Sequence, residues 1–154
     1  MEAVSTDEPV IKQASVAVMR DHAAHLFRLH YKELGMQQFD LDVDYDAWQV
    51  AENNNALLCI AAWVGDEMVG YSINTMQSHP FYGSRPWCNH VALFVHPQHR
   101  TRNIGRKILL ATESWARAYG CGMQTMHTKQ STALELMLPR MGYTVLETVW
   151  NKEL

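Results

Sequence analysis

The run from Val95 to Gly105 constrains the fold of this chain more than any other segment. A β-prone stretch, Asn89–Val95, ends at His96-Pro97, because proline donates no ladder hydrogen bond and restricts the residue before it. A helix follows almost at once, and its apolar residues recur every three or four positions at Ile104, Ile108, Ala111, Trp115 and Ala118. With a further short strand after that helix, this pattern predicts a β-α-β crossover between parallel strands.

The rest of the chain predicts the other parts of a mixed sheet. In chain order we expect helices at Ser15–Leu34 (broken near Asp21) and Asp42–Asn53, strands at Leu57–Val64, Met68–Met76, Asn89–Val95 and Met123–Met126, a helix at Ser131–Leu138 and a strand at Tyr143–Asn151. Gly65-Asp66 is a hairpin signal, whereas the prolines and glycine of Ser78–Trp87 predict a loop. The expected fold is therefore mixed α/β (α+β), an antiparallel meander followed by the crossover.

Length and composition limit the kinds of protein this can be. The 154 residues suit one domain over 1–154, with residues 1–14 as a loose lead-in that can hold a short strand at Val10–Lys12. No apolar run reaches the roughly 20 residues of a membrane span, so no membrane association is expected. The net charge of −3 argues against nucleic acid as a partner. The three cysteines form no CxxC pair, so we expect a reducing, cytoplasmic setting and no metal site.

Basic residues gather where the predicted helix begins. Arg100, Arg102, Arg106 and Lys107 oppose the helix macrodipole there, which indicates a bound anion rather than an ordinary helix start. Asn103 tolerates left-handed backbone angles, and Gly105 lets a ligand approach the backbone closely. These features predict a pocket for a di- or polyphosphate.

Three segments resemble the GNAT superfamily of N-acetyltransferases. Arg100-Thr101-Arg102-Asn103-Ile104-Gly105 resembles motif A, with Asn103 in place of the first glycine of the R/Q-x-x-G-x-G/A pattern. Gly65–Tyr71 resembles the hairpin between the second and third strands of the family, and Ser131–Tyr143 resembles motif B. The tail from His127 onward is also similar to small phage GNATs, a phage-like feature.

The resemblance implies acetyl-CoA as cosubstrate, held in a cleft where strand Asn89–Val95 splays from Met123–Met126. It implies that backbone groups of Leu93, Phe94 and Val95 pair with the pantetheine arm. Ser131 stands where the family often has an asparagine that contacts the arm. The pyrophosphate would lie on the turn formed by Arg100, Thr101, Arg102, Asn103, Ile104, Gly105 and Arg106.

The groups that would move protons are harder to identify. The family's frequent acid, a tyrosine, falls on Leu138, and its usual carboxylate falls on Asn89, which can hold a water but cannot act as a base. Candidate replacements are His90, if a strand bulge turns it toward the cleft, and His127, with Tyr82 as a further option. Each can instead be a packed or solvated side chain.

Two other groups of polar residues are explained without a catalytic or metal site. His22, His25 and His30 share one predicted helix, but no carboxylate or cysteine pattern makes them a metal site. The acidic cluster Asp40, Asp42, Asp44 and Asp46 fits a solvated helix start, although it can also attract a cationic amine.

The sequence thus predicts transfer of an acetyl group from acetyl-CoA to a primary amine of a small molecule, a protein N-terminus or a lysine. One alternative is a catalytically weak CoA-binding protein with the same fold. A second is an interaction protein whose anion turn binds nucleotide or RNA. Many members of the family dimerise, and Thr144–Asn151 is a candidate exchange surface for a homodimer.

Overall fold

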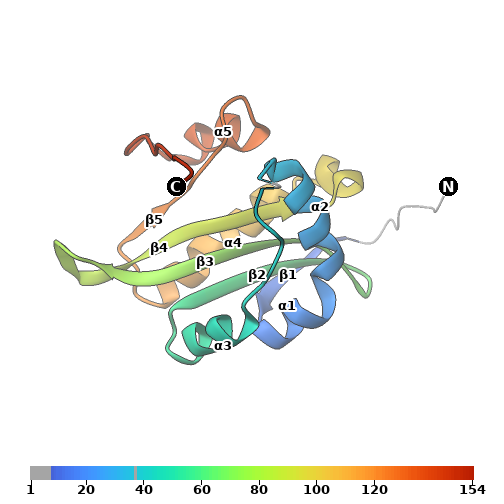
Figure 1. The fold of residues 1–154 in the computed structure, drawn as a ribbon, viewed down its shortest axis with the longest axis horizontal. Helices are drawn as coiled ribbons and strands as arrows, with labels where there is room; N and C mark the ends of the chain where they lie inside the picture. The colour runs from blue at the N-terminus through green and yellow to red at the C-terminus, as the bar shows by residue number, and fades with distance from the viewer. Residues whose placement is uncertain (1–7, 37) are drawn as a thin grey trace.

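The computed structural model of the chain describes residues 8–36 and 38–154. Its strands are β1 (Val10–Ala14), β2 (Leu57–Val64), β3 (Glu67–His79), β4 (Tyr82–Val95) and β5 (Met123–Thr125). Its α-helices are α1 (Val16–His22), α2 (Ala24–Leu34), α3 (Tyr45–Asn53), α4 (Ile104–Ala118) and α5 (Ala133–Met137), with 3-10 turns η1 (Pro97–Arg102) and η2 (Pro139–Met141). Figure 1 shows how they are arranged.

One five-stranded sheet in the order β1-β2-β3-β4-β5 organises the described residues. The first three pairings are antiparallel and the β4–β5 pairing is parallel. The connection between β4 and β5 runs through α4, as a parallel pairing requires. The predicted mixed sheet, a meander followed by a crossover, is confirmed.

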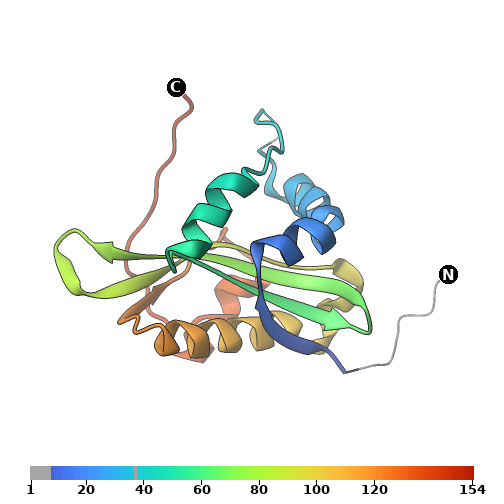
Figure 2. The ribbon, with the colours of Figure 1, turned by 90° about the horizontal axis from the view of Figure 1, so that it is seen from below.

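Helices cover both faces of the sheet. Figure 2 shows α4 on one face and α1, α2 and α3 on the other. Both layers bury apolar side chains against the sheet, and all eight residues of β2 are buried because that strand has a covered face on each side. The two hydrophobic cores hold the strands in a fixed register under the site described below.

The buried face of α4 differs from the predicted one. It runs through Ile104, Ile108, Thr112 and Ala116, while Trp115 remains 40% exposed. Thr112 is accepted in the core because its hydroxyl bonds to Ser72 Oγ at 2.9 Å. The buried face of α4 therefore includes the polar Thr112 and differs from the face that the apolar residues alone predict.

Local signals explain the first half of the chain. The strand predicted at Val10–Lys12 extends to Ala14 and pairs with β2 along its whole length. Ser15 accepts a hydrogen bond from the backbone of Val18 and starts α1, and the predicted break in the first helix lies at Ala23 rather than Asp21.

The segment Ser78–Trp87 is part of a hairpin, so its prediction as a loop is wrong. β3 and β4 continue to His79 and Tyr82 and turn over only two residues between them (Figure 1). Aromatic rings stabilise the extension. The ring centroids of His79 and Trp87 are 4.5 Å apart, and the ring of Tyr82 is parallel to that of Trp87. Ring contacts along β4 and between His79 of β3 and Trp87 of β4 thus stabilise an extended hairpin despite the two prolines.

The predicted final strand, Tyr143–Asn151, does not form. Residues 143–154 have no regular secondary structure, and Val145, Val149 and Trp150 are exposed. β5 offers only three residues, so it provides little edge for another strand to pair with. The proposal that this segment mediates dimerisation stays a prediction, and it now depends on exposed apolar side chains. No helix within the described ranges is long and apolar enough to cross a bilayer.

Candidate active site

The site is centred on the point where β4 and β5 stop pairing. The two strands pair only at Trp87–Met123, Cys88–Gln124 and Asn89–Thr125. At the last of these, Thr125 Oγ1 donates to Asn89 Oδ1 at 2.9 Å. Beyond it β4 pairs with β3 but with no other strand among the described residues, so the second edge of β4 is not part of the sheet there. The splay implied by the family resemblance is located here.

A β-bulge follows immediately in β4. His90 pairs with Asn74 and Ala92 pairs with Ile73, which leaves Val91 without a partner. Val91 is 56% exposed while His90 is 7% exposed, so the bulge exposes one residue and buries its neighbour. His90 was a candidate on the condition that a bulge turned it toward the cleft. A bulge is present, but it leaves the His90 side chain buried.

His90 lies against the segment that follows β5. Its Nδ1 accepts a hydrogen bond from the backbone N–H of His127 at 3.4 Å, and its Nε2 is buried without a partner among the described residues. Burial lowers the pKa of His90 to about 4, with smaller contributions from His127 and His30. The ring is therefore neutral near pH 7, and its lone pair on Nδ1 faces a peptide N–H. In this arrangement His90 is poorly placed to accept a proton from a substrate.

Lys129 links the segment that follows β5 to α2. Lys129 Nζ donates to the backbone carbonyl of Leu34, where α2 ends. The His127 side chain is exposed and its ring lies 6.3 Å from that of His90. Of the three predicted catalytic residues, His127 is the imidazole that a substrate can reach.

His30 also lies at this site, a position that was not predicted from the sequence. Its Nδ1 lies 2.7 Å from the hydroxyl oxygen of Tyr71, and its ring stacks on Phe94 with the centroids 4.9 Å apart. The helical period predicts that His30 shares a face with Phe27, three residues earlier. The Phe27 ring also packs on Tyr71, with the ring centroids 5.1 Å apart. What the sequence could not supply was the position of Tyr71 beneath that face.

The predicted phosphate turn has the expected backbone. η1 ends at Asn103, which adopts φ 56° and precedes the first turn of α4. Among the described residues, a Cβ on Gly105 would meet Val95 Cγ2 alone, at 3.9 Å, so these residues leave room beside the helix start. Ile104, by contrast, is fully buried and anchors the turn in the core. The first amides of a helix lack intrahelical acceptors and favour an anion.

The basic side chains of the turn have different positions. Arg100 donates to Val95 O at 3.0 Å and forms a 2.6 Å ion pair with Glu33 of α2. Thr101 and Arg106 are exposed at the surface of the turn, and the side chain of Arg102 lies outside the described structure. Arg100 thus ties the turn to α2 instead of extending freely.

The motif B segment has no tyrosine at the position where the family resemblance places the proton donor. Leu138, at the position of the family's tyrosine, is buried just after α5. Ser131 adopts φ 61° and its N–H donates to Glu135 Oε2 at 2.5 Å. The nearest tyrosine in sequence, Tyr143, is committed to Glu113 of α4 through a 2.8 Å hydrogen bond. Tyr82 lies at the hairpin end, and its described contacts join it to His79 and Trp87 alone.

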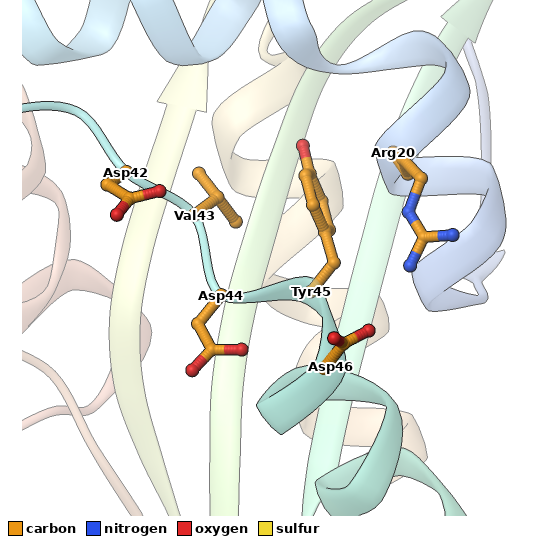
Figure 3. Close-up of a pocket in the computed structure, with 6 residues that line it drawn as sticks. All are labelled: Arg20, Asp42, Val43, Asp44, Tyr45 and Asp46. Atoms are coloured by element: carbon orange, nitrogen blue, oxygen red, sulfur yellow. The ribbon is translucent and has the colours of Figure 1, made fainter.

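An open acidic depression of about 510 Å³ lies at the start of α3 on the face that carries α1 and α2. Its lining residues, drawn in Figure 3, are Arg20, Asp42, Val43, Asp44, Tyr45 and Asp46. Asp44 caps α3 by accepting from the backbone N–H of Ala47 at 2.9 Å, while Arg20 lies 5.1 Å from the Tyr45 ring centre. One carboxylate is thus explained by the helix start. No group of metal-ligating side chains occurs among the described residues.

Comparisons with known proteins agree with this geometry. A ribosomal-protein-alanine N-acetyltransferase from Brucella melitensis biovar Abortus 2308 superposes with a TM-score of 0.75 at 13% identity, covering 96% of this chain and 100% of that one. An aminoglycoside acetyltransferase, meta-AAC0020, from an uncultured soil metagenomic sample superposes with a TM-score of 0.72 at 17% identity, covering 94% and 97%.

A second soil metagenomic aminoglycoside acetyltransferase, HMB0005, has a TM-score of 0.75 at 15% identity, covering 96% and 97%. These likenesses establish a shared fold. No curated protein sequence matches the chain significantly. The sequence does match the acetyltransferase (GNAT) family over residues 17–143, and the chain belongs to that family of acetyltransferases.

Proposed function

We propose that this acetyltransferase uses acetyl-CoA to acetylate a primary amine. The observation that carries the proposal is a helix start with a left-handed turn residue, Asn103, placed shortly after a strand edge that has lost its pairing partner. The first backbone amides of α4, which lack acceptors within the helix, would bind a pyrophosphate at the turn of Asn103 and Gly105. The edge of β4 beyond Asn89 supplies peptide groups for an extended, amide-containing arm. Coenzyme A has both chemical parts, in that order.

The residues that would hold the cosubstrate follow from this placement. Backbone groups of Leu93, Phe94 and Val95 would bind the pantetheine arm. Exposed Ser131, at the start of α5, is a candidate for a side contact to the same arm. The pyrophosphate would be bound by the turn, whose residues are Arg100, Thr101, Arg102, Asn103, Ile104, Gly105 and Arg106.

The chemistry requires an amine with a free lone pair. An ammonium must first lose a proton, and we assign its removal to His127, directly or through a water that Asn89 helps to hold. The amine nitrogen then attacks the thioester carbonyl and the C–S bond breaks. The second proton that the nitrogen must lose to become an amide passes through water to the departing thiolate. A backbone N–H on the open edge of β4 would stabilise the oxyanion. His90 supports this step by holding the backbone of His127 in place.

The acceptor can be a small molecule, a protein N-terminus or a lysine. The acidic depression beside α3 favours an acceptor with a second positive charge, because Asp42 and Asp46 lie in it beside the capping Asp44. The similar structures include enzymes named for ribosomal-protein alanine and for aminoglycosides, so both classes belong among the acceptors to be tested.

A second candidate function is CoA binding with little transfer. It is favoured by Leu138 and Asn89, which place no titratable group where the family resemblance leads one to expect a proton donor and a carboxylate. This candidate predicts tight binding of acetyl-CoA without an acetylated product.

Turnover with an amine panel separates the two. The panel comprises an alanine-initiated peptide, a lysine peptide with a blocked N-terminus and an aminoglycoside, and the readouts are thiol release and product mass. We expect acetylated product with at least one acceptor, and a strong loss of rate in His127→Gln. Binding of acetyl-CoA without product from any acceptor would favour the second candidate.

A further inference from the structure

The hydrogen bond between His30 and Tyr71 determines where the proton of this histidine lies. Tyr71 is 2% exposed, and His30 Nδ1, at 2.7 Å, is its hydroxyl's hydrogen-bond partner among the described residues. If His30 donated to this oxygen, the hydroxyl hydrogen of Tyr71 would be buried without an acceptor, which is costly. The favourable arrangement has Tyr71 donating and Nδ1 accepting.

The surroundings keep His30 neutral. Burial is the largest effect that lowers its pKa, and the positive charges of Lys129 and Arg100 lower it further, while Glu33 opposes them. Glu33 is itself paired with Arg100 at 2.6 Å, which weakens its effect on the ring. A neutral imidazole that accepts at Nδ1 carries its proton on Nε2.

Two imidazole N–H groups therefore occur at one site. His30 Nε2 makes no hydrogen bond to any residue that the structure describes, and its ring is half-buried on Phe94. His90 Nε2 is fully buried and also unpaired among those residues, while its Nδ1 accepts from a backbone N–H. A buried donor without an acceptor is unfavourable until a ligand or a water supplies one. The chemistry complementary to such N–H groups is an oxygen acceptor and not an ammonium.

We propose that Tyr71 fixes His30 as the neutral tautomer with its proton on Nε2, so that His30 donates a hydrogen bond to an oxygen atom of the acceptor substrate. Tyr71 is then a positioning residue. This inference rests on the proposed function for the identity of the ligand, but the tautomer itself does not. The acceptor is accordingly an amine that carries a carbonyl or hydroxyl oxygen close to the reacting nitrogen.

Nitrogen-15 NMR of the histidine rings in the full chain tests the tautomer without any substrate. Long-range nitrogen–proton correlations should show His30 near neutral pH with its proton on Nε2. In Tyr71→Phe the ring should shift toward the other tautomer or the charged form, because the hydroxyl donor is gone. A proton on Nδ1 in the native protein, or an unchanged ring in Tyr71→Phe, would overturn the proposal. The backbone spectrum of each variant reports whether it is folded.

A matched pair of substitutions tests the role of His30. Glutamine places an N–H donor near the position of Nε2, whereas glutamate has the same shape and is a hydrogen-bond acceptor and a base. His30→Gln should keep most of kcat/KM, and His30→Glu should lose at least tenfold, mainly in KM, with acetyl-CoA affinity unchanged in both. Higher activity in His30→Glu than in His30→Gln would show a proton acceptor at this position and refute the donor role.

The acceptor class is tested with oxygen-containing and oxygen-free amines. Alaninamide supplies a carbonyl, glucosamine supplies hydroxyls, and propylamine supplies neither. We expect propylamine to be the poorest of the three, with a preference that shrinks in His30→Glu. Equal use of all three amines by the native protein would contradict the oxygen contact. Failure of acetyl-CoA to bind at all would instead count against the proposed function and leave the NMR result valid.

Discussion

Replacing Gly105 by glutamate places a negative charge where the proposed pyrophosphate binds, and the structure allows the substitution otherwise. A Cβ at this position would contact only Val95 Cγ2 at an ordinary 3.9 Å. Glutamate is a better helix former than glycine by up to about 1 kcal/mol, and a carboxylate in the first turn of a helix adds a few tenths more. We therefore expect Gly105→Glu to be folded and at least as stable as the native protein.

Its affinity for acetyl-CoA should fall sharply. Two like charges about 4 Å apart near a protein surface repel by about 4 kcal/mol, an upper limit of roughly a thousandfold in affinity. The glutamate side chain can turn toward solvent and reduce this, so the expected loss in calorimetric titration is between about tenfold and a thousandfold. Stability and affinity thus move in opposite directions, which separates this effect from misfolding.

Gly83→Glu is the matched control. Among the described residues, no atom other than those of its chain neighbours lies within 4 Å of a Cβ on Gly83, so glutamate fits there. Gly83 lies near the start of β4 and far along the chain from Gly105, so the variant adds the same charge away from the turn in sequence. We expect its affinity for acetyl-CoA to equal that of the native protein. Unchanged affinity in a folded Gly105→Glu variant would refute the assignment of the turn.

Three further predictions concern stability, measured by urea unfolding. Because Asn103 holds φ 56°, Asn103→Gly should be neutral or stabilising and Asn103→Val should cost at least about 1–2 kcal/mol; equal stability of the two would contradict the left-handed turn. The pKa of His90, about 4 against an ordinary 6.5, means that the unfolded chain binds a proton the folded chain does not in that interval. The free energy of unfolding should therefore fall by up to on the order of 3 kcal/mol as the pH drops from 6.5 to 4. His90→Gln should lose less over the same interval, and identical pH profiles of the native protein and His90→Gln would refute this prediction. Tyr143→Phe should cost about 1–3 kcal/mol by leaving Glu113 without its hydroxyl donor, and no change would show that the tail is not held there.

Local chemistry made much of the fold predictable. Gly65, at φ 57°, forms the turn between β2 and β3 that the Gly-Asp pair indicated, and Asn103 adopts the left-handed backbone that the motif requires. These positions are determined by backbone sterics within a few residues. The β-α-β crossover was likewise predictable, because a strand followed directly by an amphipathic helix has few ways to pack.

Features that depend on distant partners were not predictable. Ser78–Trp87 contains turn-forming residues, but the stacking of His79, Tyr82 and Trp87 across the hairpin extends the strands. Val145 and Val149 have strand-like character, but the three-residue β5 gives them little edge to pair with.

The site shows the same division. A bulge beside His90 could be considered from the strand alone, although not which side chain it would bury, whereas the pairing of His30 with Tyr71 joins α2 to β3 across 41 positions of sequence. Nothing local to either residue indicates the other. The sequence therefore predicted the backbone of the Asn103 turn more completely than the side-chain contacts between α2 and the sheet.

Calorimetric titration of the native protein with acetyl-CoA, with ATP as the comparison, tests the central claim most directly. The account predicts one acetyl-CoA bound per chain with much weaker binding of ATP, because in the proposed site the edge of β4 beyond Asn89 would pair with the pantetheine arm that ATP lacks. No binding of acetyl-CoA, or equal binding of the two ligands, would contradict the proposal that this turn and strand edge form a coenzyme A site.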